Sequence, residues 1–182
     1  LAQHSHVSPP PLAARRERTT VIVDGDHVRL EGPGLLDLGG IAKGYAVDEV
    51  VRLLVSLGAT SVLVDGGGDL RGHGASFPIG VADGLVVETR HGAIATSSTR
   101  RRRWRTSDDR VFHHIIDPHS GRSAEGSLDT VTVIASTAAT ADALATALLV
   151  APEKVLGRLP KLGAYALMRS RDRNWWLTPG TP

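Results

Sequence analysis

The most regular hydrophobic pattern in the chain lies between residues 41 and 57, where apolar side chains recur every three or four positions. This spacing predicts an amphipathic α-helix, which ends at Gly58, a natural C-terminal stop. A short apolar run at residues 35–38 predicts a strand before it, and Gly39-Gly40 between the two predicts a tight turn. We therefore expect a strand, a glycine turn and a helix in succession.

A second helical pattern covers residues 138–150, with small and apolar side chains on one face. Ser136 or Thr137 stands at the position where a hydroxyl can cap this helix, and residues 152–159 predict a further short helix. Each long helix follows a β-rich region, so the two halves of the chain resemble one another loosely. This similarity suggests an internal duplication.

Short runs rich in β-branched and apolar residues predict the strands. These runs are 19–23, 27–31, 60–65, 77–81, 85–90, 92–97, 111–117, 129–136, 163–169 and 174–177. Most strands follow one another directly instead of alternating with helices. This order predicts an α+β fold with mixed or antiparallel sheets and amphipathic helices, and it argues against a doubly wound fold.

Length and composition place the chain among ordinary globular proteins. It has 182 residues and a mass of 19.2 kDa, with 41% hydrophobic and 22% charged residues, which excludes wholesale disorder, collagen and coiled coils. Residues 1–18 contain three consecutive prolines and no apolar period, so we expect a disordered lead or linker before one domain at 19–182. No segment has the pattern of a membrane span or a signal peptide. Both the cytoplasm and the mature part of an exported protein stay open as locations.

Cysteine usage and charge narrow the possible chemistry. The chain has no cysteine, which excludes disulfides, thiolate metal sites and cysteine nucleophiles. Its 21 basic and 19 acidic residues nearly balance, so net charge does not argue for a nucleic-acid partner. The arginine-rich run at 100–105 is a local exception. Because few aromatic residues accompany it as stacking platforms, we interpret it as a solvated edge strand and expect no nucleic-acid partner.

The glycine turn before the first helix is a candidate anion site. Helix N-termini leave backbone N–H groups unpaired, and Lys43 adds a positive charge in the first turn. The alternative is that Gly39 and Gly40 only permit a tight turn against a packed helix. Asp37, just before the turn, is either a ligand contact or a cap.

Two further pairs of oxygen-bearing side chains are candidates for a ligand or metal site. Asp142 and Thr146 are four residues apart on the second helix, so they share a face and offer hard oxygen ligands to a cation such as Mg²⁺. The alternative is a surface aspartate beside a threonine that bonds back to its own helix. Asp65 and Asp69 flank three glycines, a loop that is either the edge of a ligand site or a plain hairpin.

The segment His113–Pro118 is a candidate for acid–base chemistry. On a strand, His114 and Ile116 share one face and Asp117 follows at the end, so an imidazole and a carboxylate would meet near a turn. Such a pair could position or deprotonate a hydroxyl group. The alternative is that one of the two adjacent histidines is purely structural.

Five ordered segments carry a resemblance to a known family: LDLGGIAKGYAVDEV, VDGGGDLRGHG, IATSS, HHIIDPHSG and TADALATAL. In this order and spacing they closely resemble the ApbE-like FAD:protein FMN transferases, whose fold is T-fold-like. The resemblance implies an enzyme that binds FAD and Mg²⁺, transfers FMN to a threonine or serine hydroxyl of a target protein, and releases AMP. Targets in the family include flavin-carrying subunits of the sodium-translocating NADH:quinone reductase and related redox complexes.

The resemblance also assigns roles in the flavin site. It implies that Asp37 and Lys43 contact FAD and that the segment from His114 to Ile116 lines the flavin site. A base such as His114 or Asp117 would take the proton of the attacking hydroxyl. Which of the two acts as the base stays open.

The metal site implied by the resemblance consists of the carbonyl oxygen of Gly40 and the side chains of Asp142 and Thr146. Family members carry a long N-terminal portion with further flavin contacts, and residues 1–18 cannot replace it. Since the only methionine is Met168, we expect part of the protein to precede residue 1. Two alternatives to the transferase therefore stay open, a non-catalytic FAD-binding fragment and a pyrophosphatase that hydrolyses FAD to FMN and AMP.

Overall fold

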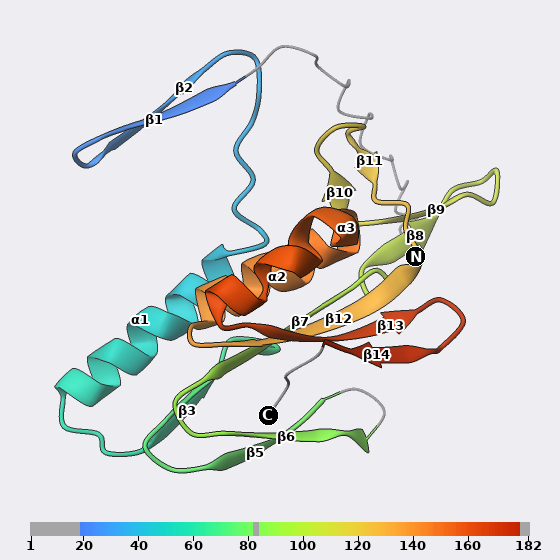
Figure 1. Ribbon diagram of the computed structural model, residues 1–182. Helices are drawn as coiled ribbons and strands as arrows, with labels where there is room; N and C mark the ends of the chain where they lie inside the picture. Colours follow the sequence, from blue (N-terminus) through green and yellow to red (C-terminus); the bar gives the residue numbers. More distant parts are fainter. Residues whose placement is uncertain (1–18, 82–83, 179–182) are drawn as a thin grey trace, which may run out of the picture.

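The computed structural model describes residues 19–81 and 84–178, and a six-stranded sheet forms its centre (Figure 1). The spatial order is β14-β13-β12-β7-β4-β3, and each neighbouring pair is antiparallel. The strands are β3 (Val62–Asp65), β4 (Asp69–His73), β7 (Ala93–Ser98), β12 (Leu128–Ala135), β13 (Tyr165–Ser170) and β14 (Trp175–Leu177). The predicted α+β class is confirmed, and of the mixed or antiparallel sheets that it allowed, the structure shows antiparallel pairing.

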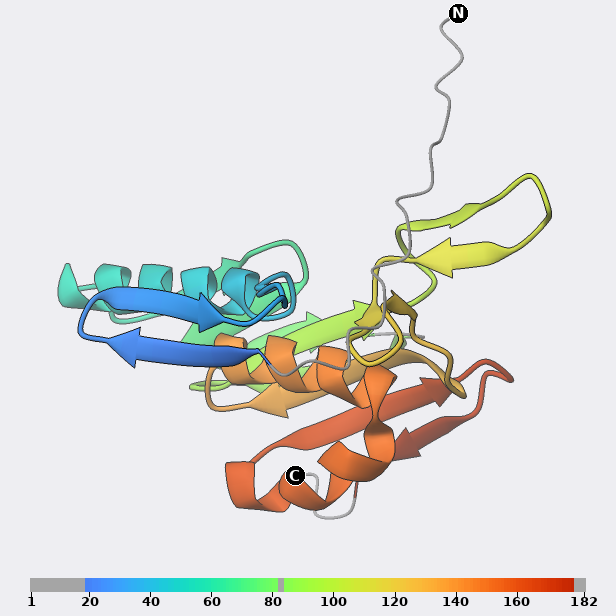
Figure 2. The ribbon, with the colours of Figure 1, turned by 90° about the horizontal axis from the view of Figure 1, so that it is seen from above.

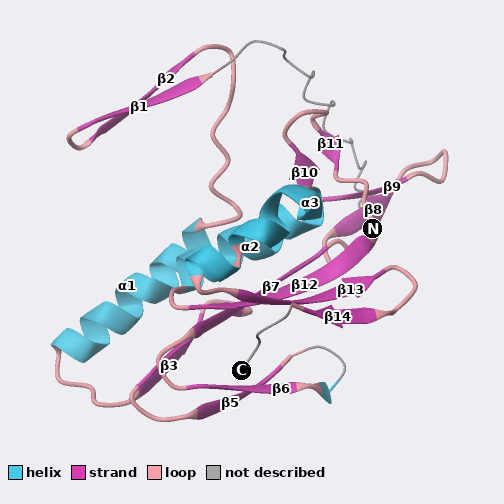
Figure 3. Cartoon of the chain, viewed as in Figure 1, coloured by secondary structure: helices cyan, strands magenta, loops and turns pink. Residues whose placement is uncertain are grey.

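Two long helices lie against each other on one face of this sheet (Figures 1 and 3). Helix α1 (Ala42–Ser56) covers β3 and β4, and α2 (Ala138–Val150) covers β7 and β12. Both helices are confirmed, and Thr137 caps α2 by accepting a hydrogen bond from the N–H of Thr140 at 3.2 Å. The chain then passes through α3 (Pro152–Val155) and two short 3-10 turns, η2 (Leu156–Arg158) and η3 (Pro160–Leu162), before β13.

Alanine makes the close contact between α2 and the sheet. Ala141 and Ala145 of α2 are fully buried, as are Ala95 of β7 and Val131 and Val133 of β12. Small side chains let the helix axis approach the strands closely, while the branched residues of β12 fill the remaining volume. The main hydrophobic core therefore lies between α2 and the centre of the sheet.

Four two-stranded hairpins surround the sheet in the described ranges. They are β1 (Thr20–Asp24) with β2 (His27–Glu31), β5 (Phe77–Gly80) with β6 (Val86–Thr89), β8 (Arg103–Arg105) with β9 (Val111–His113), and β10 (Ile116–Asp117) with β11 (Arg122–Ser123). The β8–β9 hairpin projects beyond the end of the sheet in both views (Figures 1 and 2). Within residues 19–81 and 84–178, no helix has the length and hydropathy needed to cross a bilayer.

Three details differ from the sequence predictions. Residues 35–38 form no strand, because their leucines are exposed and no neighbouring strand pairs with them. Strand β4 was missed, because one glycine and three polar residues among its five positions hide its β-pattern. The strand predicted at 111–117 is broken, since β9 ends at His113 and β10 begins at Ile116. The expected lead at residues 1–18 lies outside the described residues, and the internal duplication stays a prediction.

Candidate functional site

The turn before α1 is held by its own side chain and backbone. Asp37 Oδ1 accepts a hydrogen bond from the N–H of Gly39 at 2.7 Å, and the carbonyl of Leu38 accepts from the N–H groups of Ile41 and Ala42. Of the two roles open for Asp37, the structure shows the turn cap. The sequence predicts unpaired backbone N–H groups in this turn. The N–H groups of Gly39, Ile41 and Ala42 all have acceptors, so that prediction is wrong for these three groups.

Lys43, in the first turn of α1, extends between two buried carboxylates. Its Nζ lies 3.0 Å from Asp69 Oδ2 and 3.1 Å from Asp142 Oδ2. Both aspartate side chains are 3% exposed, whereas the lysine side chain is 45% exposed. Since Asp69 begins β4 and Asp142 lies on α2, three elements meet at one ammonium group. With both carboxylates ionised, this cluster carries one net negative charge.

Burial governs the protonation of the cluster. It raises the pKa of Asp69 to about 6, where the negative charge of Asp142 adds to the effect and Lys43 opposes it. Partial burial disfavours the charge on Lys43, but hydrogen bonds and attraction from the two carboxylates outweigh it and raise the pKa of the lysine. Asp69 Oδ2 forms an ion pair with Lys43 but no well-aligned hydrogen bond among the described residues. Lys43 therefore stays charged at neutral pH, while Asp69 takes up a proton in mild acid.

The glycine loop between β3 and β4 contains two aspartates with different contacts. Asp65 Oδ1 accepts hydrogen bonds of 2.8 Å from the N–H groups of Gly67 and Gly68, which closes the hairpin. Asp69, at the far side of the loop, joins the Lys43 cluster instead. The same short motif therefore contains one structural and one candidate functional carboxylate.

Gly44 lets α1 and α2 cross closely enough to form this cluster. Its N–H lies 3.4 Å from Asp142 Oδ2, and a Cβ at this position would lie 2.3 Å from the carbonyl oxygen of Ala138. Any side chain at residue 44 would therefore push the helices apart. The interpretation of Asp142 as a surface aspartate is wrong, because the helix contact leaves it only 2% exposed.

Gly40 and Thr146 lie against each other at the start of α1. A Cβ on Gly40 would lie 3.2 Å from Thr146 Cγ2 and 3.3 Å from its Oγ1. The Thr146 hydroxyl pairs with the hydroxyl of Ser97 on β7 at 2.9 Å, so it does not bond back to its own helix. Since Asp142 lies one turn earlier on α2, the three predicted metal ligands are gathered around one end of α1.

The donor atoms at this place fit a hard cation. Carboxylate, hydroxyl and carbonyl oxygens suit Mg²⁺, which keeps several waters and uses few protein carboxylates. Asp142 directs Oδ2 at Lys43 and Gly44, and in the part of the chain that the structure describes its Oδ1 makes no hydrogen bond. No group of three or more His, Cys, Asp or Glu side chains gathers in those ranges. A cation here would therefore rely on backbone, hydroxyl, water and substrate oxygens beside Asp142.

Asp48 fixes how the two helices sit against each other. Its Oδ1 accepts from Arg71 at 2.6 Å and from the N–H of Ala138 at 2.9 Å, and its Oδ2 accepts from the N–H of Ala139 at 2.9 Å. The carboxylate thereby accepts hydrogen bonds from the first backbone N–H groups of α2, which have no acceptor within that helix. Sequence reasoning missed this residue, although an acidic side chain on the buried face of α1, beside Val47, is the available signal.

His114 lies just beyond β9, with its side chain exposed. Partial burial lowers the pKa of His114, and the positive charges of Arg102 and Lys43 lower it further. A neutral imidazole near a cationic group can accept a proton at neutral pH. Its neighbour His113 is the structural member of the pair, because it is buried and its Nε2 lies 3.1 Å from the carbonyl oxygen of Ala124.

Asp117 holds the next turn. Its Oδ1 accepts from the N–H of His119 at 2.9 Å and its carbonyl accepts from the N–H of Gly121 at 2.8 Å. The hydrogen bond from His119 lowers the pKa of Asp117. The predicted meeting of Asp117 with His114 is not found among the contacts of the described residues. Ile116, at the start of β10, is 37% exposed.

Comparison with known proteins decides the family. The model of the ApbE family matches residues 3–166. The chain belongs to the ApbE family. Its recognition from five sequence segments is thereby confirmed, and the antiparallel fold agrees with solved ApbE structures.

The similar proteins are flavin transferases by name. The FAD:protein FMN transferase of Treponema pallidum is 35% identical over 156 residues, which is 73% of this ApbE chain and 43% of the relative. That of Escherichia coli is 34% identical over 161 residues, or 79% and 46% of the two chains. This ApbE chain therefore spans less than half the length of both curated relatives.

Two solved structures share the fold. The ApbE protein of Thermotoga maritima superposes with a TM-score of 0.75 at 33% identity, covering 87% of this chain and 57% of that one. The apo form of the Pseudomonas stutzeri flavinyl transferase ApbE gives a TM-score of 0.69 at 32% identity, with 87% and 52% covered. Most of this ApbE chain thus has a counterpart in about half of each larger structure.

Proposed function

We propose that this ApbE chain takes part in protein flavinylation, in which FMN is transferred from FAD to a threonine or serine hydroxyl of a target protein and AMP is released. The observation that carries the proposal is the position of Lys43 between Asp69 and Asp142, directly after the glycine turn. Cleavage of a pyrophosphate needs a cation beside the phosphates and oxygen ligands for a metal. Here Lys43 supplies the cation from the first turn of α1, and Asp142 supplies a carboxylate oxygen from α2 beside it.

Lys43 and Asp37 are the proposed contacts to FAD. The Lys43 side chain is 45% exposed, so its ammonium group can offset negative charge on the phosphates while the two carboxylates hold that group in place. Asp37 is exposed and has a second carboxylate oxygen beyond the one that caps the turn. That oxygen can accept a hydrogen bond from a hydroxyl or ring N–H of the substrate.

Mg²⁺ is the proposed metal, held by the carbonyl of Gly40 and the side chains of Asp142 and Thr146. When bound, Mg²⁺ would neutralise negative charge on the pyrophosphate of FAD. The fold holds these ligands in place, because the crossing of α1 and α2 buries Asp142 and a hydrogen bond to Ser97 holds the Thr146 hydroxyl.

The acceptor step requires a base, and His114 is the better candidate. The hydroxyl oxygen of the acceptor forms a bond to the FMN phosphorus, the bond from that phosphorus to the AMP oxygen breaks, and AMP leaves. The hydroxyl proton passes to the imidazole, whose lowered pKa keeps it neutral and able to accept it. Asp117 is engaged by the turn that it caps. Ile116, two residues further along the chain, is the proposed apolar contact for the flavin.

The proposed acceptors are flavin-carrying subunits of NADH:quinone reductase-type redox complexes. Two other functions remain candidates. The exposed His114 could equally take a proton from water. With water as the acceptor of FMN, the chain would be an FAD pyrophosphatase. The other is an FAD-binding unit without turnover, which would use the same contacts of Lys43 and Asp37 to FAD.

One titration separates these functions. The purified chain is mixed with FAD, with and without Mg²⁺, while flavin fluorescence and AMP release are followed in the same samples. Transfer requires covalent flavin on an added acceptor subunit, detected by in-gel fluorescence. AMP without labelled protein identifies the pyrophosphatase, and binding without AMP identifies the binding unit. Absence of FAD binding in a folded sample would overturn all three.

A further inference from the structure

A broad groove lies between the β8–β9 hairpin, β11 and the turn that follows β13. It encloses about 1250 Å³. This volume exceeds the roughly 300–1,000 Å³ of pockets that take compact small molecules. An extended polypeptide segment therefore fits the groove better than a compact ligand does.

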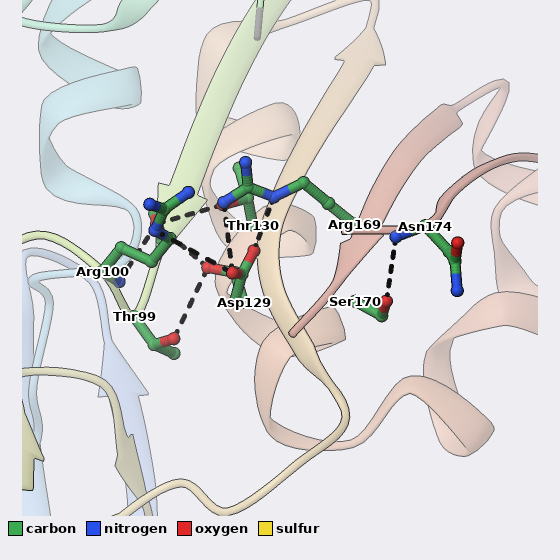
Figure 4. A network of polar contacts seen from close by, with 8 residues as sticks. Thr99, Arg100, Asp129, Thr130, Arg169, Ser170 and Asn174 are labelled. Carbon is green, nitrogen blue, oxygen red and sulfur yellow. Dashed lines mark hydrogen bonds and ion pairs between the residues drawn. The ribbon is translucent and has the colours of Figure 1, made fainter. Parts of the chain in front are cut away.

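The groove is strongly basic. Two acidic residues, Glu125 and Asp129, line it. Six arginines line it as well: Arg100, Arg103, Arg110, Arg122, Arg171 and Arg173. The Asp129 carboxylate is already neutralised, because Arg169 binds both of its oxygens at 2.9 and 3.1 Å and Arg100 lies 4.0 Å away (Figure 4). Asp129 therefore does not offset the arginine charge, and Glu125 can offset one of the six arginines.

Four of the arginines have no acidic partner among the described residues. Arg110 pairs with Asp108 outside the groove at 2.7 Å. In contrast, within residues 19–81 and 84–178 no carboxylate lies at ion-pair distance from the remaining four exposed guanidinium groups. These are Arg103 on β8, Arg122 on β11, and Arg171 and Arg173 after β13. Charge distributed over three segments complements an acidic chain that runs along the groove.

The aromatic residues of the groove argue against a nucleic acid. Trp104 and Phe112 stack on each other with ring centroids 6.4 Å apart, and the guanidinium of Arg110 lies 5.8 Å from the centroid of the Phe112 ring. Single-stranded nucleic acids need free ring faces on which bases stack. Here Trp104 and Phe112 stack on each other, so the two rings do not form separate platforms for successive bases.

The groove reaches the proposed flavin site. Ile116, the proposed flavin contact, also lines the groove, and so does His113, the residue before the proposed base. We infer that the groove docks an acidic segment of the flavin-accepting protein and so presents its hydroxyl to His114. This inference rests on the proposed function for the identity of the partner, but the docking itself needs neither FAD nor turnover.

The first test is a binding measurement without FAD. A rhodamine-labelled peptide with aspartate and glutamate on both sides of one threonine is titrated with the chain and followed by fluorescence anisotropy. Its counterpart carries asparagine and glutamine instead. We expect the acidic peptide to bind at least about tenfold more tightly at low salt, with a difference that shrinks as ionic strength rises. Equal binding of the two peptides would overturn the inference.

Charge-reversal variants locate the binding. Arg122→Glu with Arg171→Glu changes two walls of the groove, and Arg158→Glu with Lys161→Glu is a control with the same change of net charge at exposed positions outside it. The groove variant should lose at least about tenfold in affinity for the acidic peptide, while the control keeps it. If charge reversal lowers the melting temperature, Arg122→Gln with Arg171→Gln tests the same contacts. Unchanged affinity in a folded groove variant would overturn the inference.

The same variants separate this inference from the proposed function. We expect the groove variant to retain FAD binding and AMP release. Loss of FAD binding would make the groove part of the FAD site and overturn its role in docking. Displacement of the peptide by oligothymidine at equal concentration would overturn it in favour of a nucleic acid. A wild-type chain that binds the acidic peptide but neither binds nor cleaves FAD would refute the proposed function alone.

Discussion

The ammonium group of Lys43 lies 3.1 Å from the carboxylate of Asp142, although 99 residues separate them in the chain. The contact joins the first turn of α1 to α2 and gives a buried carboxylate its counter-charge. Because Asp69 is a second partner at 3.0 Å, Lys43 remains held when another cation engages Asp142. The cluster therefore combines a fixed lysine with a carboxylate that can accept a metal.

Asp142→Ala should lower stability as well as remove the proposed metal ligand. The change leaves the buried N–H of Gly44 without its acceptor and Lys43 with one carboxylate. We expect a loss of about 1–3 kcal/mol in the free energy of unfolding, measured by urea denaturation. Asp172→Asn, at an exposed turn, is the control and should change it by less than about 0.5 kcal/mol. Equal stability of the Asp142 variant and wild type would contradict the buried ion pair.

Asp48→Ala should destabilise the pair of helices α1 and α2 more than removal of an exposed carboxylate of α1 does. It removes two hydrogen bonds to the start of α2 and the partner of Arg71. The expected cost is about 2–4 kcal/mol, seen as a lower midpoint in urea. The neighbouring Glu49→Ala loses an exposed pair with Arg52 and should leave the urea midpoint nearly unchanged. Similar costs for the two variants would argue against capping by Asp48.

Gly44→Ala should be destabilising even though alanine is the better helix former. The intrinsic preference favours alanine by about 1 kcal/mol, but overpacking costs about 1–3 kcal/mol. With the Ala138 carbonyl oxygen 2.3 Å from the added Cβ, the clash should dominate and lower the melting temperature. Gly157→Ala meets no atom within 4 Å and should be neutral or stabilising. A stabilised Gly44 variant would mean that the helices do not cross this closely.

The stability of the metal-free chain should depend on pH through Asp69. Burial raises its folded-state pKa to about 6, above the unfolded value of about 3.9, so between these values the folded state binds more protons. The free energy of unfolding of wild type, relative to Asp69→Asn, should therefore fall as pH rises from about 4 to about 6 and level off above. Urea denaturation in EDTA buffers across this range measures it. A difference that rises with pH would show that Lys43 stabilises the ionised form more than burial opposes it.

His114→Gln should reduce turnover without loss of FAD binding. Removal of a general base typically costs about 10²–10⁴-fold, and the effect should appear in kcat for AMP release. Wild-type turnover should fall as pH drops and His114 becomes protonated, and the variant should lose this dependence. His119→Gln, at an exposed position in the next turn, is the control and should keep both. A His114 variant with wild-type kcat and pH profile would remove this residue from the proton transfer.

The two long helices could be predicted from sequence because their evidence is local. Hydrophobic spacing, Thr137 before α2 and Gly58 after α1 lie within a few residues of the elements that they delimit. The motif around Lys43 and the segment around His114 likewise carry the family resemblance in short strings. Residues 35–38 show the limit of such evidence, because an apolar run becomes a strand only when a partner strand is available.

The sequence by itself therefore determined the helices, most strands, the α+β class and the family. Only the tertiary structure decided that Asp142 is buried, that Asp69 shares Lys43 with it, and that Asp48 caps a helix 90 residues away. The physical reason is that burial and charge pairing depend on which distant segments pack together. Helix periodicity is set by neighbours along the chain, whereas the cluster at Lys43 exists only where α1, α2 and β4 meet.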